Sequence, residues 1–163
     1  MTAAMHVRAA DTNELDALAK LWFDAWQDGH AAVVPAELAR RRTFADFRKR
    51  LAAHLPLVRV IGPVGAPLGF SIVKENELYQ LFVASAARGT GIADALIGEA
   101  EARVAAQGAG MIWLTCAIGN SRAARFYEKR GWRRAGTVRD VLETPEGPFP
   151  FDVWRYEKPL TRS

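Results

Sequence analysis

The chain has 163 residues, half of them hydrophobic and a quarter charged, a composition typical of soluble globular proteins. This length suffices for one domain, expected over residues 1–163, whose core needs no disulfide or metal for stability, and the single cysteine excludes an intramolecular disulfide and a cysteine-based zinc site. The N-terminal segment lacks the apolar core of a signal peptide, and no stretch approaches the roughly 18 apolar residues of a membrane span, so we expect a cytoplasmic protein without a membrane partner.

The N-terminal half of the sequence predicts a short strand, two helices and three further strands. The first strand is expected within residues 5–10, and Asp11 caps the helix that follows it. The apolar stripe of this helix consists of Leu15, Leu18, Trp22 and Ala25. Antiparallel strands are expected at residues 57–62 and 67–75, and a further strand at 76–84.

Much of the net charge of +4 comes from a basic segment, ARRRTFADFRKRL at residues 39–51. Such a segment could attract nucleic acid or an anionic ligand. With Thr43 as N-cap and Phe44, Phe47 and Leu51 at helical spacing, it instead predicts an amphipathic helix whose arginines face water. On the polar side of this helix no aromatic residue interleaves the arginines as a base-stacking surface would require, so we expect no nucleic-acid partner.

The C-terminal half predicts two helices that alternate with strands. The expected elements are a helix at 91–107, a strand at 111–118, a short helix capped by Asn120 or Ser121, and strands at about 132–142 and 150–158 around a turn-rich segment at 144–150. The strands at 78–84 and 111–118 form a βαβ unit with the helix between them, so they should be parallel and adjacent. The element order βααβββαβαββ indicates an α/β or α+β domain around one mixed sheet.

The most specific short motif is RGTGIA, residues 88–93, at the start of a predicted helix. The first turn of a helix offers unpaired N–H groups, two glycines let the backbone approach a phosphate group closely, and Arg88 adds a cation. The GxxxxGK[ST] pattern of nucleoside triphosphatases is absent. A dinucleotide fingerprint would have glycine where Asp94 stands and an acidic residue about 20 positions further on, which the sequence lacks, so NAD is disfavoured.

A second motif, NSRAARFYEKRG at residues 120–131, makes the pattern much more specific. At their observed spacing, the two motifs resemble those of the GCN5-related N-acetyltransferase (GNAT) superfamily, most strongly over residues 77–132. Ser85 departs from the family, which often has proline there. The resemblance implies the GNAT fold, an α/β (α+β) domain with a single mixed, mostly antiparallel sheet of about six or seven strands, flanking helices and a central parallel pair that splays apart.

The resemblance also implies acetyl-CoA as the donor co-substrate and no metal. The pyrophosphate would bind the glycine loop, and the pantetheine would insert between the splayed strands. There it would meet backbone N–H groups around Leu81 to Val83. The implied cofactor-binding residues are Leu81, Phe82, Val83, Arg88, Gly89, Thr90, Gly91, Ile92, Ala93, Asn120, Phe126 and Tyr127.

Acetyl transfer to an amine needs a proton acceptor and a proton donor. By resemblance, Tyr127 is the general acid near the thioester sulfur, although it could instead only pack on the cofactor. Period-two alternation would place Glu77, Tyr79, Leu81 and Val83 on one face of their strand. Because several members of the family have a glutamate near this place, the resemblance implies Glu77 as the general base, with a surface carboxylate at the start of a strand as the alternative. His30 is the alternative base, and some members of the family use only water.

The acceptor is the least constrained part of the prediction. The resemblance places it opposite CoA, between the first two helices and the last hairpin. The residues expected there are Trp26, His30, Tyr79 and Trp154. Asp24 and Asp28 beside Trp26 could bind a cationic amine. We expect a primary amine of a small molecule or a peptide as acceptor, with a homodimer left open. The alternative function is a non-catalytic CoA-binding module that recruits an anionic partner through its basic segment.

Overall fold

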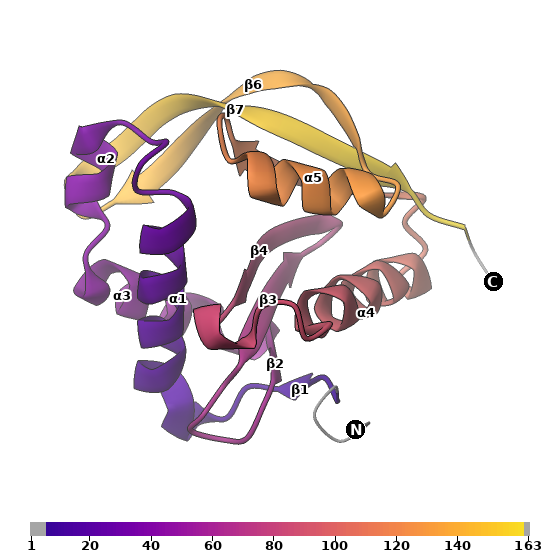
Figure 1. Ribbon diagram of the computed structural model, residues 1–163, viewed down its shortest axis with the longest axis horizontal. Coiled ribbons are helices and arrows are strands. Elements are labelled where there is room, and N and C mark those ends of the chain that lie inside the picture. Colours follow the sequence, from indigo (N-terminus) through magenta and orange to yellow (C-terminus); the bar gives the residue numbers. More distant parts are fainter. Residues whose placement is uncertain (1–5, 162–163) are drawn as a thin grey trace.

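A computed structural model describes residues 6–161 and contains a seven-stranded sheet in the order β1-β2-β3-β4-β5-β7-β6 (Figure 1). The strands are β1 (Arg8–Ala9), β2 (Val58–Ile61), β3 (Gly69–Lys74), β4 (Glu77–Val83), β5 (Met111–Ala117), β6 (Arg133–Thr144) and β7 (Gly147–Pro159). The helices are α1 (Leu15–Gly29), α2 (Ala36–Arg41), α3 (Phe44–His54), α4 (Ile92–Ala106) and α5 (Ser121–Lys129). Within residues 6–161, none of these helices combines the length and apolar content needed to cross a bilayer.

The only parallel pair in the described sheet, β4 and β5, is joined over a very short distance. Their register consists of a single Cα pair, Glu77 with Trp113, beside a hydrogen bond of 3.1 Å from the Trp113 N–H to the Asn76 carbonyl. Beyond this point the two strands diverge, whereas β5 continues to pair with β7 along its whole length. The expected mostly antiparallel sheet with a splayed central parallel pair is therefore confirmed.

A bulge in β4 changes which side chains face each side of the sheet. Ile72 lies opposite Gln80 while Val73 lies opposite Leu78, so Tyr79 is an extra residue in β4. As a result Tyr79 packs against the cluster under α1 and α3, whereas Leu81 packs against clusters that include α4. The expectation that Glu77, Tyr79, Leu81 and Val83 share one face is therefore wrong, because the bulge interrupts the alternation.

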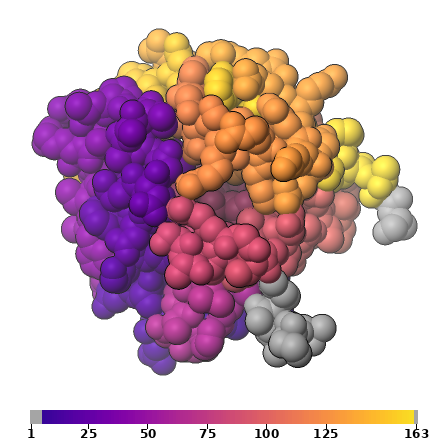
Figure 2. Space-filling view, in the orientation of Figure 1, coloured from indigo at the N-terminus to yellow at the C-terminus, as the bar shows by residue number. Residues whose placement is uncertain are grey.

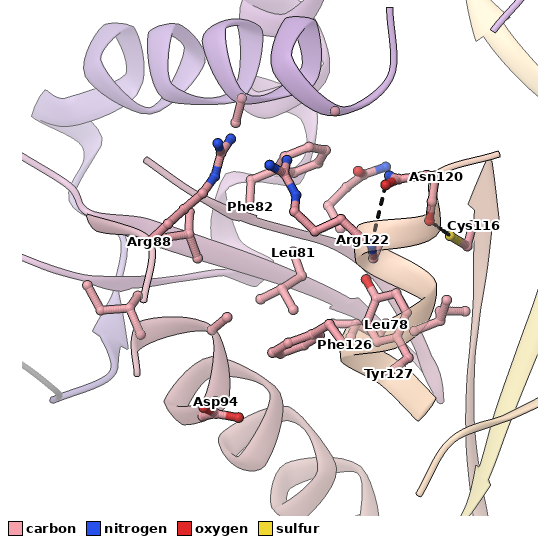
Figure 3. A pocket seen from close by; sticks show the side chains of 18 of the residues that line it. Leu78, Leu81, Phe82, Arg88, Asp94, Cys116, Asn120, Arg122, Phe126 and Tyr127 are labelled. Carbon is pink, nitrogen blue, oxygen red and sulfur yellow. Dashed lines mark hydrogen bonds between the residues drawn. The ribbon is translucent and has the colours of Figure 1, made fainter. Parts of the chain in front are cut away.

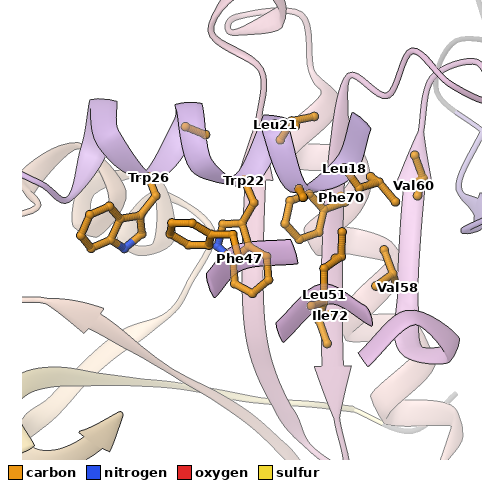
Figure 4. Packing of buried hydrophobic residues seen from close by; sticks show 12 residues of the cluster. Leu18, Leu21, Trp22, Trp26, Phe47, Leu51, Val58, Val60, Phe70 and Ile72 are labelled. Atoms are coloured by element: carbon orange, nitrogen blue, oxygen red, sulfur yellow. The ribbon is translucent and has the colours of Figure 1, made fainter. Parts of the chain in front are cut away.

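Helices α1 and α3 cover one face of the first four strands with an aromatic cluster (Figure 4). Trp22 is fully buried, and its ring centroid lies 5.1 Å from that of Phe47 and 5.6 Å from that of Phe70. Phe44, expected to join this core, is 39% exposed and meets only the edge of it, with its ring centroid 6.5 Å from that of Phe23. It is the first residue of α3, where the helix leaves the sheet.

The basic segment forms parts of two helices that meet at Arg42. Thr43 caps α3 as expected, since its hydroxyl accepts a hydrogen bond of 3.1 Å from the Asp46 N–H. Arg42, however, is only 3% exposed. It donates to the Asp46 carboxylate and to the Glu143 carbonyl, both at 2.8 Å, so partners within the protein replace water around its charge. The expectation that the arginines of this segment face water is therefore wrong for Arg42, and it is wrong for the largely buried Arg41 and Arg50 as well.

The last two strands form a longer hairpin than the sequence suggested. Only residues 145–146 separate β6 from β7, so most of the expected turn-rich segment lies within strands. Pro148 and Pro150 are tolerated because β5 pairs with β7 only from Val153 onward. At its start β7 has a single neighbour, so a proline there need not donate to a second strand.

Candidate active site

The splay between β4 and β5 opens into a cavity of ≈ 430 Å³. Its walls come from β4, the loop before α4, the first turn of α4, β5 and α5, and the end of α1 forms one rim. Figure 2 shows the molecular surface hollowed between α1, this loop and α5. All the residues expected at the cofactor site except Thr90 line this cavity, whereas the Thr90 hydroxyl donates to the Ala87 carbonyl at 2.5 Å.

The glycine loop presents the first turn of α4 to the cavity. Gly89 has a φ of 78° and Gly91 a φ of 89°, so both take the left-handed conformation that other residues rarely adopt. A Cβ atom at Gly89 would meet nothing within 4 Å, so backbone conformation rather than lack of space accounts for this glycine. Gly91 is the N-cap of α4, and the first N–H groups of the helix have no partner within it. The loop is therefore suited to bind an anion.

Three arginines line the cavity around this loop, namely Arg88, Arg122 and Arg130, and the last two were not identified from the sequence. Figure 3 shows Arg88 and Arg122. The Arg88 guanidinium lies 3.2 Å from the Asp28 carboxylate, and Arg130 pairs with Asp94. Arg122 projects from the start of α5 towards the end of α1. Arg122 and Arg130 lie in or next to the second motif, but only the packing of α5 determines which of its basic residues face the cavity.

Backbone donors on β4 also face the cavity. The Ala84 N–H donates to the Leu68 carbonyl at 2.9 Å, on the side of β3. Because N–H groups alternate between the two sides of a strand, those of Val83 and Leu81 point towards β5. Since β5 has already diverged there, these two N–H groups are available to a ligand.

The side chains expected from α5 lie on the opposite wall of the cavity. The Asn120 side chain accepts a hydrogen bond of 3.3 Å from the Ala123 N–H and so caps α5 while lining the cavity. The Tyr127 ring packs against Trp132, with ring centroids 5.8 Å apart. Burial, followed by the effect of Cys116, raises the pKa of Tyr127, so its phenol stays protonated at neutral pH. Burial likewise raises the pKa of the Cys116 thiol to about 11.

A second, smaller cavity of ≈ 90 Å³ adjoins the first between α1, α3 and the β6–β7 hairpin. Four residues line both cavities, namely His30, Tyr79, Gln80 and Thr115. Of the residues expected at the acceptor site, Trp26 lines the second cavity, and its ring is stacked on that of His30 with centroids 5.8 Å apart. Gln80 and Thr115 were not identified from the sequence, because their place at this junction depends on the bulge in β4 and on the splay.

His30 lies where the two cavities join, in surroundings that lower its pKa. Its buried Nδ1 atom has no hydrogen-bond partner among the described residues. Burial, with a smaller effect of Arg122, lowers its pKa from 6.5 to about 4. At neutral pH His30 is therefore an uncharged imidazole that can accept a proton.

Other residues expected at the site lie outside both cavities. Glu77 stands at the start of β4, where burial raises its pKa. The Arg134 guanidinium lies over the Trp154 ring, with the Arg134 Cζ atom 3.8 Å from the ring centroid. Asp24 pairs with Lys20 at 2.7 Å and does not join Trp26. Within residues 6–161 no group of three or more His, Cys, Asp and Glu side chains is placed to hold a metal ion.

Comparisons with known proteins agree with this architecture. The model of the acetyltransferase (GNAT) family matches residues 15–132. A GCN5-related N-acetyltransferase from Rhodopseudomonas palustris has a similar structure, with a TM-score of 0.72, 20% identity and coverage of 95% of both chains. The PaiA N-acetyltransferase of Thermoplasma acidophilum, solved with coenzyme A, gives a TM-score of 0.70 at 19% identity, over 94% of this chain and 98% of that one.

YncA, a putative acetyltransferase from Salmonella typhimurium solved with acetyl-CoA, gives a TM-score of 0.69 at 17% identity, over 97% of this chain and 95% of that one. A search of the curated proteins finds no match. The structural likenesses show the fold, and the family model covers most of the chain, including both sequence motifs. This protein belongs to the GNAT family of acetyltransferases.

Proposed function

We propose that this protein is an acetyl-CoA-dependent N-acetyltransferase that moves the acetyl group directly to a primary amine. Membership of the family supports the reaction class, and the described complexes of two structural neighbours with coenzyme A or acetyl-CoA support the donor. The observation that carries the proposal is the junction of two cavities along the splayed strands. One cavity has the anion-binding loop that a pyrophosphate needs, and the other offers a separate approach for an amine.

In the proposed reaction the glycine loop and Arg88 hold the pyrophosphate of acetyl-CoA. The amine enters from the second cavity and forms a C–N bond with the acetyl carbonyl carbon. The N–H groups of Leu81 and Val83 stabilise the negative oxygen of the tetrahedral intermediate. As the C–S bond breaks, the Tyr127 hydroxyl donates to the departing sulfur. Because its pKa is raised, Tyr127 remains in the form that can donate.

The attacking amine must lose a proton, since a free primary amine has a pKa of about 10.4. His30 lines both cavities and could accept this proton directly. Glu77 lines neither, so it would act through water. Replacing each in turn, His30→Gln and Glu77→Gln, separates the two roles. The variant that lacks the base should show a much lower kcat, about 10²-fold or more, at unchanged affinity for acetyl-CoA.

Binding of the donor tests the first half of the proposal. Acetyl-CoA should raise the melting temperature, because it binds the folded protein only. Gly91→Glu should abolish this shift by placing a carboxylate and an unfavourable backbone conformation at the phosphate loop. Gly98→Glu is the matched control, since Gly98 lies on the same helix with open space around it. No shift at millimolar acetyl-CoA, in folded protein, would contradict the proposal.

Turnover tests the second half. A library of primary amines, read by release of free thiol and by the mass of the acetylated product, should identify an acceptor. With that acceptor, Tyr127→Phe should lower kcat by about 10²-fold or more while acetyl-CoA still raises the melting temperature. Unchanged turnover would exclude Tyr127 as the proton donor.

The alternative of a non-catalytic module with a basic docking segment is less well supported, because the arginines of that segment are largely ion-paired. Arg40 and Arg41 both pair with Glu37, and Arg42 pairs with Asp46. The charges of these three arginines are therefore already paired within the protein and are less available to recruit an anionic partner.

A further inference from the structure

The second cavity has two arginines on one wall that share a single buried carboxylate. Arg42 and Arg50 both line this cavity, and Asp46 lies beside them, only 5% exposed. The Asp46 Oδ2 atom is 2.8 Å from Arg42 but 3.9 Å from Arg50. Arg42 also donates to the Glu143 carbonyl at 2.8 Å. Asp46 therefore neutralises Arg42 first, which leaves Arg50 with a weak, distant ion pair.

Arg50 is nevertheless held in a defined orientation. Its guanidinium lies over the Trp22 ring, 4.5 Å from the centroid, and its Nη2 atom donates to the Tyr79 hydroxyl at 3.3 Å. The side chain is only 15% exposed. A guanidinium stacked on a ring in this way keeps N–H groups at its edge free to bind a carboxylate through two parallel hydrogen bonds. A half-buried charge also gains more from a counter-ion than a charge in water does.

The other charged group that lines the cavity is Asp140, from β6. Its carboxylate accepts a hydrogen bond of 2.9 Å from the Val141 N–H, and it acts electrostatically on Glu77. The pKa of Arg42 is lowered first by burial and then by the neighbouring Arg50, against the opposing effect of Asp46. The small cavity thus combines an excess of positive charge at one wall with a carboxylate from another element, an arrangement complementary to a zwitterion.

We propose that the acceptor is a small primary amine that also carries a carboxylate or a similar oxyanion, and that Arg50 binds this anionic group. The inference rests on the proposed transferase function. Tyr79 touches Arg50 and also lines both cavities, so Arg50 lies beside the junction at which the amine would meet the donor. The volume of ≈ 90 Å³ is far below that of pockets for drug-sized ligands, about 300–1,000 Å³, and suits a molecule of amino-acid size.

Matched acceptors test the proposal on the unmodified protein. We would measure kcat/KM for a series of α-, β- and γ-amino acids against their carboxamides, which keep the amine and the shape but lose the negative charge. At least one acid should exceed its amide by about 10- to 100-fold, the effect of a hydrogen bond to a charged group. Peptides with acidic residues at their N-termini form a third arm, and they should react poorly.

Variants then assign the effect to Arg50. Arg50→Gln should reduce the ratio of acid to amide to about 1, with the larger loss for the acid and mainly through its KM. Arg48→Gln is the matched control, because Arg48 lies on the same helix, is exposed and pairs with Asp16 outside the cavity. The thermal shift with acetyl-CoA verifies that each variant is folded and binds the donor.

A binding readout separates this inference from the proposed function. In the presence of CoA, each acid of the series and its amide are tested for a further rise of the melting temperature. At least one acid should give this rise, and its amide should not. Such a shift without any turnover would support the anion site and contradict the transferase function. Turnover with equal preference for acids and amides, or a preference for amides or acidic peptides, would overturn the anion site and leave the transferase function standing. Neither shift nor turnover with any amine would overturn both.

Discussion

His30 illustrates how burial sets the charge of one side chain in this protein. Burial lowers its pKa from 6.5 to about 4, so the unfolded chain binds more protons than the folded chain between these two values. His30 therefore contributes stability that is fully present above pH 6.5 and is lost as the pH falls towards 4. The same imidazole lines both cavities, so the burial that affects stability also keeps this side chain uncharged at their junction.

The stability of the protein should accordingly depend on His30 in weak acid. Between pH 7 and pH 4.5, the free energy of unfolding of the unmodified protein should fall by about 2 kcal/mol more than that of His30→Gln. Urea denaturation at a series of pH values measures this difference. His6→Gln, at an exposed position, should behave as the unmodified protein does. If the free energy of unfolding changed equally with pH in the unmodified protein and in His30→Gln, the lowered pKa of His30 would be contradicted.

Among the elements, the connection of α3 to the final hairpin depends on one buried ion pair. Arg42 bridges the Asp46 carboxylate on α3 and the Glu143 carbonyl on β6. Asp46→Asn would leave the Arg42 charge buried without its counter-ion and should lower the free energy of unfolding by about 3 kcal/mol. Asp16→Asn, which breaks the exposed pair with Arg48, should cost at most about 1 kcal/mol. Equal costs in chemical denaturation would contradict a special role for the buried pair.

Local sequence patterns predict several elements of this fold but not the contacts between segments far apart in the chain. Periodicity predicts α1, α4 and the strands that flank them, because their burial patterns repeat locally. The burial of Arg42 could not be predicted, since its second partner, Glu143, lies 101 residues away. The sequence motifs likewise predict the loop at Gly89 and Gly91. They do not predict Arg50 at the second cavity, which only the packing of α3 against β4 brings there.

For the whole molecule, the sheet consists of two parts with a narrow connection. Strands β1 to β4 and strands β5 to β7 share one register pair, Glu77 with Trp113. A donor bound along the splay would contact both parts and should hold them together. Acetyl-CoA at 100 times its Kd should therefore stabilise the protein by about 2.7 kcal/mol.

Binding of acetyl-CoA should also protect some backbone amides from hydrogen exchange more than others. Hydrogen exchange should show the strongest added protection at the Leu81 and Val83 amides, which face the gap, and little at the edge pair of β1 with β2. CoA without the acetyl group is a suitable control and should protect nearly the same amides, because most of the same contacts remain. Uniform protection along all strands would contradict a donor that inserts between the two parts.

The extra residue in β4 has a consequence for how this protein can change over evolution. Tyr79 lines both cavities and touches Arg50, whereas Leu81, Phe82 and Val83 after it line only the first cavity. Substitutions at Tyr79 can thus change the junction of the two cavities, and substitutions at these later residues can change the first cavity alone. Deleting this one residue would exchange the two faces for the rest of the strand or pull the strand out of register. A point change at Tyr79 can therefore alter the junction of the two cavities, whereas a single-codon deletion there would disturb the walls of both cavities at once.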